Sequence, residues 1–264
     1  MKTWLHGLTL VMGLASVMSA IASESVTLPL YETHYVGKVS GFSIKMSRTL
    51  TREDHRFTLS QGGGNFLWNL HEESHFRLEE GRLLGDSFEY QLGGISKRRR
   101  EVQFDEAAGV IRSLKKKQWT EHPWSAELLD RLSIQEQVRL LLLEASEPMQ
   151  TISLTLIDGP KINTKTFELI ETVVLDTPVG KLNTVHYREI HEDPSRRSSD
   201  TWLAVDHSYL MVKTVHDERG TEMVLELTSG SLEGADITGL APAEAQQNQT
   251  PEGAGQALGS VTPL

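Results

Sequence analysis

Cysteine is absent from all 264 residues of the chain. This absence excludes disulfide bonds, a catalytic thiolate and thiolate metal ligands. It also argues against a bacterial lipoprotein anchor, because that anchor needs a cysteine at the cleavage point. The G-x-S-x-G nucleophile elbow, the phosphate-binding loop and the G-x-G-x-x-G turn are missing as well. The sequence therefore predicts no bound cofactor and carries no persuasive signature of an enzyme.

Long apolar runs are scarce, and the clearest one lies near the start, from Leu8 to Val17. Lys2 precedes this run and small residues follow it, which is the order of a cleavable export signal. The run is too short to cross a membrane comfortably. We therefore expect residues 1–22 to be a signal peptide that is cleaved after Ala22, and the mature protein not to be an integral membrane protein.

Positive charge is also in short supply. The chain has 26 lysine and arginine residues against 36 aspartate and glutamate residues, a net charge of −10. A protein with this balance has no general attraction for nucleic acid, because the phosphate backbone is itself anionic. Nucleic acid is therefore not an expected partner.

The residues that can build a core lie between 23 and 233, enough for one domain. The remainder, 234–264, is rich in glycine, proline, alanine and glutamine and has few residues that could anchor a core. We predict a single β-rich domain over 23–233 and a disordered tail over 234–264.

Side chains alternate between apolar and polar with a period of two through most of the domain, which is typical of half-buried strands. The triple glycine at 62–64 is predicted to be a turn or a flexible loop. The expected strands are Tyr31–Val39, Phe42–Leu50, His55–Ser60, one within 65–80, Leu83–Leu92, Arg98–Phe104, Val110–Trp119, Thr151–Ile157, Lys165–Val174, Lys181–Glu189, Ser199–Val205, Leu210–His216 and Met223–Leu227.

One amphipathic helix is expected at about 133–145, where apolar residues recur at helical spacing. Ser133, with Glu136 three residues later, predicts a capping box at its start. A short helical turn over Ser125–Arg131 is a further possibility. Many strands joined by short turns favour a mainly β fold: an antiparallel curved sheet that closes toward a barrel or half-barrel, with the helix capping or plugging its opening.

The stretch HEESH, residues 71–75, matches the H-E-x-x-H signature of zinc hydrolases. On a helix, His71, Glu72 and His75 would share one face and could hold a metal and a general base. On a strand the two histidines lie about 13 Å apart, and Glu72 points to the opposite face. Because the surrounding residues have strand periodicity, we disfavour these three residues as a catalytic site and expect no metal there.

A set of segments along the chain resembles the domain of unknown function 3108 family of exported proteins from Gram-negative bacteria. The matching stretches are YVGKVSGFSIKMSRTL, ESHFRLEEGRLLGDSFEYQLGG, FDEAAGV, LLDRLSIQEQVRLLL, TPVGKLNTVHYRE and DTWLAVDHSYLMVKTVHDERGTEMVLEL. The resemblance implies a β-rich domain located in the periplasm. It implies no catalytic residues, because the family has none established.

Two basic runs stand out in this acidic chain and fall on consecutive predicted strands that could pair. Their lysine and arginine side chains could grip an anionic lipid headgroup or glycan phosphate, or they could merely protect a sheet edge. The candidates are Lys97, Arg99, Lys115 and Lys117.

Aromatic residues cluster just before the predicted helix, at the place where a barrel mouth would lie. Trp119, His122 and Trp124 could contact a ligand there, or the two tryptophans could seal the core. The sequence favours a periplasmic, non-enzymatic binding or accessory protein of the cell envelope, with a hydrophobic or amphipathic ligand. A protein–protein scaffold of an envelope complex is the alternative, and the zinc hydrolase is the disfavoured one. The possible partners are an envelope lipid, a glycan or an envelope protein.

Overall fold

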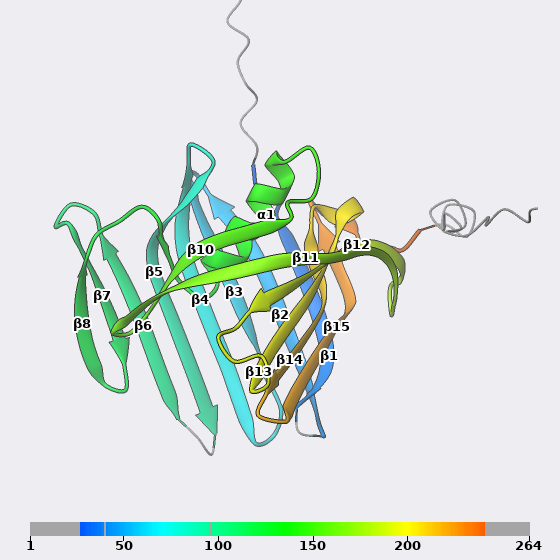
Figure 1. The fold of residues 1–264 in the computed structure, drawn as a ribbon, viewed down its shortest axis with the longest axis horizontal. Helices are drawn as coiled ribbons and strands as arrows, with labels where there is room; N and C mark the ends of the chain where they lie inside the picture. The colour runs from blue at the N-terminus through cyan, green and yellow to red at the C-terminus, as the bar shows by residue number, and fades with distance from the viewer. Residues whose placement is uncertain (1–26, 40, 95–96, 241–264) are drawn as a thin grey trace, which may run out of the picture.

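One curved β-sheet dominates the computed structural model, which describes residues 27–39, 41–94 and 97–240 (Figure 1). The strand order is β8-β7-β6-β5-β4-β3-β2-β1-β15-β14-β13-β12-β11-β10-β9, and the short strand β16 pairs with β15. The predicted signal peptide, 1–22, and the part of the predicted tail beyond 240 lie outside the described residues.

The first arm of the sheet consists of eight consecutive antiparallel strands. They are β1 (Tyr31–Val39), β2 (Phe42–Glu53), β3 (Arg56–Gly64), β4 (Trp68–Glu79), β5 (Arg82–Gly94), β6 (Arg98–Asp105), β7 (Val110–Lys115) and β8 (Gln118–Pro123).

The second arm begins with a short strand just before the helix, continues after the helix and returns to the first arm where β15 pairs with β1. Its elements are β9 (Leu128–Leu129), α1 (Ser133–Glu144), β10 (Thr151–Asp158), β11 (Lys161–Thr177), β12 (Gly180–Ile190), β13 (Arg197–Ala204), η1 (Val205–His207), β14 (Leu210–Glu218), β15 (Thr221–Leu232) and β16 (Ala235–Asp236).

The sheet is mainly antiparallel and remains unclosed, as the sequence predicted in outline. Its two terminal strands, β8 and β9, do not pair with each other. The arms nevertheless meet, because Asp158 on β10 accepts hydrogen bonds from Arg100 Nη1 (2.9 Å) and Lys115 Nζ (2.5 Å) on β6 and β7. The result is a half-barrel with the helix α1 inside its curve (Figure 1).

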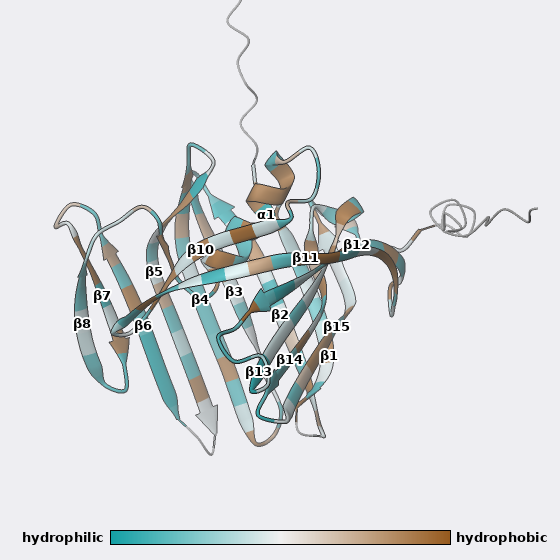
Figure 2. Ribbon diagram, viewed as in Figure 1, coloured by the Kyte–Doolittle hydropathy of each residue, from teal (hydrophilic) through white to brown (hydrophobic). Residues whose placement is uncertain are grey.

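Period-two burial produces the core. On β1, for example, Tyr31, Thr33 and Tyr35 are buried while the residues between them are exposed. The buried side chains of successive strands and of α1 form the main cluster on the concave face. Phe57 and Phe76 stack there on neighbouring strands, with ring centroids 5.6 Å apart. The hydropathy colouring shows the same alternation along the strands and both apolar and polar residues on α1 (Figure 2).

The strands of the first arm have their turns at two opposite ends, which differ in what lies beside them. The turns β2–β3, β4–β5 and β6–β7 lie at the helix end, where Gln137 of α1 accepts a hydrogen bond from Leu83 N (2.8 Å) and donates one to Gly81 O. Because consecutive strands are antiparallel, the other turns lie at the opposite end of the strands, which we call the open end. These turns are β1–β2, β3–β4, β5–β6 and β7–β8.

The prediction of a turn or loop at the triple glycine, 62–64, was wrong. Gly62, Gly63 and Gly64 do not form a turn but continue β3, paired with β2 and β4. A Cβ on Gly64 would lie 2.2 Å from Trp68 O, so the strand needs glycine there to fit between its neighbours.

Two further predictions were wrong in detail. The expected strand Val110–Trp119 is two strands, β7 and β8, joined by a hairpin at Lys116 and Lys117. Ser125–Arg131 contains the two-residue strand β9 rather than a helical turn. Leu128 and Leu129 are extended because they pair in parallel with β10. The local sequence pattern does not reveal a partner that lies so far along the chain.

The helix start also differs from the predicted capping box. Asp130 Oδ1 accepts hydrogen bonds from Leu132 N (2.8 Å) and Ser133 N (3.0 Å), so Asp130 caps the turn that leads into α1. Glu136 turns away from the helix start and binds two arginines.

The prediction placed the start of the disordered tail, residue 234, too early in the chain. Residues 234–240 belong to the fold: β16 pairs with β15, and Leu240 N donates to Lys181 O at 2.7 Å. Ile237 is only 4% exposed. Its apolar side chain is therefore part of the core, although the composition around it is typical of a tail. Among the described residues, no helix has the length and apolar character that a membrane crossing requires.

Candidate functional site

The HEESH segment lies on β4, as its periodicity predicted. His71 is exposed on the outer face, while Glu72 points to the concave face and is 4% exposed. His75 is held by Thr58 Oγ1 and Glu73 Oε1, each at 3.0 Å. No group of three or more metal-ligating side chains is assembled in the part of the chain that the structure describes. The geometry of a zinc hydrolase, with the base beside the metal, is not present at these residues.

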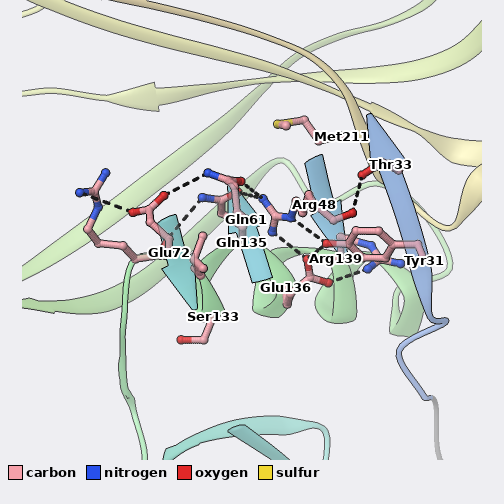
Figure 3. A network of polar contacts seen from close by, with 12 residues as sticks. Tyr31, Thr33, Arg48, Gln61, Glu72, Ser133, Gln135, Glu136, Arg139 and Met211 are labelled. Atoms are coloured by element: carbon pink, nitrogen blue, oxygen red, sulfur yellow. Dashed lines mark hydrogen bonds and ion pairs between the residues drawn. The ribbon is translucent and has the colours of Figure 1, made fainter. Parts of the chain in front are cut away.

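Glu72 instead belongs to a polar network under α1 (Figure 3). Its Oε2 accepts a hydrogen bond from Gln61 Nε2 (3.0 Å), and its Oε1 lies 3.8 Å from Arg131 Nη1. Burial raises the pKa of Glu72 above its ordinary value, although Arg131 and Arg48 oppose this. A carboxyl in this setting is costly to bury and is tied to the helix side of the sheet.

Glu136 is the centre of the network. Its Oε1 accepts hydrogen bonds from Tyr31 Oη (2.7 Å) and Arg48 Nη2 (2.8 Å), and its Oε2 accepts one from Arg139 Nη1 (2.5 Å). Arg48 Nη1 also donates to Gln135 Oε1 (2.5 Å). Burial alone would raise the pKa of Glu136, but Arg139 and Arg48 outweigh it and lower that pKa. Glu136 is therefore a carboxylate with a fixed set of donors.

This network can hold α1 to the sheet but has little capacity for proton transfer. Arg48 and Glu136 are charged, fully enclosed and already paired, and burial raises the pKa of Tyr31. The Arg139 guanidinium lies over the Tyr31 ring, 4.9 Å from its centroid, and Arg139 Nη2 is buried with no hydrogen-bond partner. The arrangement is that of a latch between helix and sheet rather than an active site.

Beyond the reach of α1, the concave face stays apolar toward the open end. Cross-strand pairs put its side chains on one surface: Val39 pairs with Met223 and with Phe42, and Leu70 pairs with Leu92. These positions share strand parity with core residues, yet they are only partly buried, and Phe42 is 48% exposed. The members of this apolar surface are Val39, Phe42, Trp68, Leu70, Leu92 and Met223.

A polar cluster continues the same surface across the second arm. Ser199 Oγ lies 2.7 Å from His216 Nδ1 and 3.1 Å from His191 Nε2, and Glu189 Oε1 lies 3.4 Å from His191 Nδ1. Lys165 forms an ion pair with Glu189. Burial, helped by Arg197, lowers the pKa of His216. The concave surface of the open end thus combines apolar side chains with convergent hydrogen-bonding groups.

The order of carboxylate, imidazole and hydroxyl in Glu189, His191 and Ser199 is also that of a hydrolase triad. Two contacts oppose that use. Lys165 already occupies the carboxylate of Glu189, and His216 competes with His191 for the Ser199 hydroxyl. The cluster is better suited to binding a polar group than to activating a nucleophile.

The predicted aromatic site is divided by the structure. Trp119 is 44% exposed on the edge strand β8, while Trp124 packs against the main core. His122 Nε2 lies 2.9 Å from Gly159 O, which joins β8 to the β10–β11 turn. These residues lie near the junction of the two arms rather than at one mouth.

The predicted basic residues also separate. The two runs do lie on paired strands, since Arg100 opposes Lys115. Lys115 is bound by Asp158, and Arg99 forms an ion pair with Glu101, whereas Lys97 and Lys117 are exposed. Only the latter pair is available for a ligand.

The sequence reasoning missed the latch and the histidine cluster. Tyr31 and Arg48 sit at core parity on their strands, so a polar residue at an apolar position was the available signal. Ser199 and His216 share one face of a strand pair, but their pairing register could not be known without the fold.

Two depressions occur on the outer side of the sheet. One, of about 530 Å³, lies between β1, β15 and the segment 236–238, and the other, of about 400 Å³, lies over Gly62 and Gly63. Both are open rather than enclosed.

The fold and site define a class: a mainly β protein with one curved, unclosed antiparallel sheet and a helix latched inside it. The chain belongs to the family described as protein of unknown function (DUF3108), which it matches over residues 30–228. No curated protein matches it.

Two solved structures match most of the chain at low sequence identity. A β-barrel-like protein of domain of unknown function DUF1849 from Brucella abortus has 11% sequence identity and a TM-score of 0.53, covering 78% of this chain and 99% of its own. A protein described as a lipoprotein from Parabacteroides distasonis has 10% identity and a TM-score of 0.29, covering 77% and 96%. The first supports the barrel-like fold, and the second is too distant in shape to carry an argument.

Proposed function

We propose that this protein is a non-enzymatic binding or accessory protein of the bacterial cell envelope, which holds a hydrophobic or amphipathic ligand against the open end of its concave face. The observation that carries the proposal is the apolar surface of Val39, Phe42, Trp68, Leu70, Leu92 and Met223, which continues the core but is left partly uncovered by α1. An uncovered apolar surface beside polar groups is typical of a ligand site.

The polar cluster supports an amphipathic ligand in particular. An acyl or other apolar chain would lie on the first arm, and its polar head would meet Ser199, His191 and His216 on the second arm. The predicted export signal at 1–22 and the family resemblance support an envelope location.

The test is a fluorescence titration with cis-parinaric acid as the probe. Val39→Asn places an amide on the apolar surface, and Val36→Asn, on the same strand but on the outer face, is the matched control. We expect the wild type and Val36→Asn to bind with similar affinity and Val39→Asn to bind about tenfold more weakly, since one apolar contact is lost. Absence of binding to the wild type, or equal binding by both variants, would contradict the proposal.

A scaffold role has one observation in its favour. The outer side of β8 is unpaired in the strand order, so a partner strand could add to it. Pro123 and the neighbouring Lys116 and Lys117 oppose this use, because proline and lysine protect edges from pairing. We therefore rank it second.

A further inference from the structure

The open end of the first arm also carries charge and aromatic side chains that the ligand site does not use. Its turns present Phe66, Lys97, Arg98, Lys116 and Lys117, which we call the basic rim. We propose that the basic rim docks the protein on the surface of an anionic lipid bilayer. The inference goes beyond the proposed function, because it concerns where the protein is held and not what it binds inside its curve.

Phe66 gives the first argument. It is 87% exposed at the tip of the β3–β4 turn, the most exposed of the large apolar residues in the described chain. The turn is held in place, since Asn65 Oδ1 accepts hydrogen bonds from Leu67 N (2.8 Å) and Trp68 N (3.3 Å), and Asn65 N donates to Trp68 O (2.9 Å). An aromatic ring held out by a fixed turn loses little entropy when it inserts into a membrane interface.

The hairpin between β7 and β8 gives the second argument for membrane docking. Lys116 and Lys117 form its two-residue loop, with φ angles of +52° and +65°. Both positions favour asparagine and glycine, because a side chain at positive φ crowds the backbone. Two lysines at such positions are unfavourable for the hairpin, which points to a role outside folding.

The basic side chains of the rim are free to act. Lys97, Arg98, Lys116 and Lys117 are exposed, and none has an ion-pair or hydrogen-bond partner among the described residues. By contrast, the neighbouring Lys115 is bound by Asp158. The same stretch of sequence thus supplies one lysine to the fold and leaves two at the surface.

Charge is separated along the first arm. The three turns of the helix end each carry two carboxylates: Glu53 and Asp54, Glu79 and Glu80, and Asp105 and Glu106. The described residues of the four open-end turns include none. A protein with a net charge of −10 is repelled by an anionic surface as a whole, so this separation would orient the open end toward it.

The experiment is sedimentation of the full mature chain with vesicles of phosphatidylcholine alone or with phosphatidylglycerol added. We expect binding to the anionic vesicles only, weakened by salt. Lys116→Asn with Lys117→Gly should reduce the affinity about 25-fold, at about fivefold per charge near the surface. The same double variant puts the residues that the loop favours at both positions, so misfolding cannot explain a loss.

A matched control removes the same charge from the other end. Arg52→Gln with Arg82→Gln lies at the helix end and should leave vesicle binding unchanged. Phe66→Ser should reduce binding about tenfold at both low and high salt, because its contribution is apolar. Equal binding to neutral and anionic vesicles, or equal losses in the two charge variants, would overturn the proposal.

The vesicle test is independent of the ligand test. Lys116→Asn with Lys117→Gly does not alter the apolar surface and should bind cis-parinaric acid as the wild type does. Loss of vesicle binding with retained probe binding supports docking alone. Retention of both vesicle binding and probe binding removes docking while leaving the proposed ligand site intact.

Discussion

At the scale of single residues, the most informative group is Glu136. Its carboxylate accepts hydrogen bonds from Arg48, Arg139 and Tyr31 in an environment where neither arginine can reach water, since their side chains are each 4% exposed. Buried ion pairs contribute little to net stability, because desolvation offsets their attraction. Their removal is costly nonetheless, since the partner charges stay behind.

We therefore expect Glu136→Gln to lower the free energy of unfolding by roughly 3–5 kcal/mol. Glutamine has nearly the same volume, so the effect isolates the charge. Glu127→Gln, on an exposed residue whose nearest cation is 3.8 Å away, should change it by less than about 0.5 kcal/mol. Urea unfolding followed by tryptophan fluorescence measures both. Similar midpoints for the two variants would mean that the latch does not hold α1.

At this scale, the sequence predicted correctly which face of a strand a residue occupies. Glu72 was expected on the side opposite to His71, and the structure has it buried there. The partners of Glu72 were out of reach, because Gln61 and Arg131 come from β3 and from the turn before α1. A strand's parity tells which face a residue occupies, but not which distant groups meet it.

At the scale of elements, the run Gly62–Gly64 shows how a local rule fails. Glycine usually interrupts strands, which is why this run predicted a loop. Here the neighbouring strands approach so closely that a Cβ on Gly63 would lie 2.1 Å from Lys45 O. The strand continues because it has no side chains, and this reason lies in β2 and β4 rather than in β3.

This packing predicts a sharp difference between adjacent glycines. Gly64→Ala should destabilise the protein by roughly 3 kcal/mol or more, since its Cβ would meet Trp68 O at 2.2 Å and its φ is +150°. Gly62→Ala is the control, because its Cβ would lie 3.5 Å from Leu70 O, an ordinary contact. Thermal unfolding followed by circular dichroism compares them. An equal loss of stability would show that the conformational freedom of the run, rather than the collision, is what matters.

At the scale of the whole molecule, the unclosed sheet depends on contacts between its arms. The antiparallel arrangement of the strands could be predicted, because the strands of each arm are neighbours in sequence. The junction could not, since Asp158 meets Arg100 and Lys115 across 58 and 43 residues of chain. Long-range contacts of this kind set the curvature, and no periodic pattern records them.

Asp158→Asn tests whether that junction holds the half-barrel together. Asp158 is partly buried, and although burial would raise its pKa, Lys115 and Arg100 lower it below the ordinary value. We expect a loss of roughly 1.5–3 kcal/mol at neutral pH, the usual contribution of hydrogen bonds to a charged group. Hydrogen exchange measured by mass spectrometry should show faster exchange in β6, β7 and β10, while α1, latched by Glu136, keeps its protection.

The contribution of Asp158 to the free energy of unfolding should depend on pH. Because the folded pKa of Asp158 is depressed, its stabilisation is complete above the unfolded pKa of about 3.9 and is lost as the pH falls through the folded value. The difference between wild type and Asp158→Asn should therefore shrink at acid pH. Glu121→Gln, which breaks the exposed pair with Arg112 on the same arm, should change neither exchange nor stability measurably. If Asp158→Asn left the exchange of both arms unchanged, the strand order alone would have to maintain the curve.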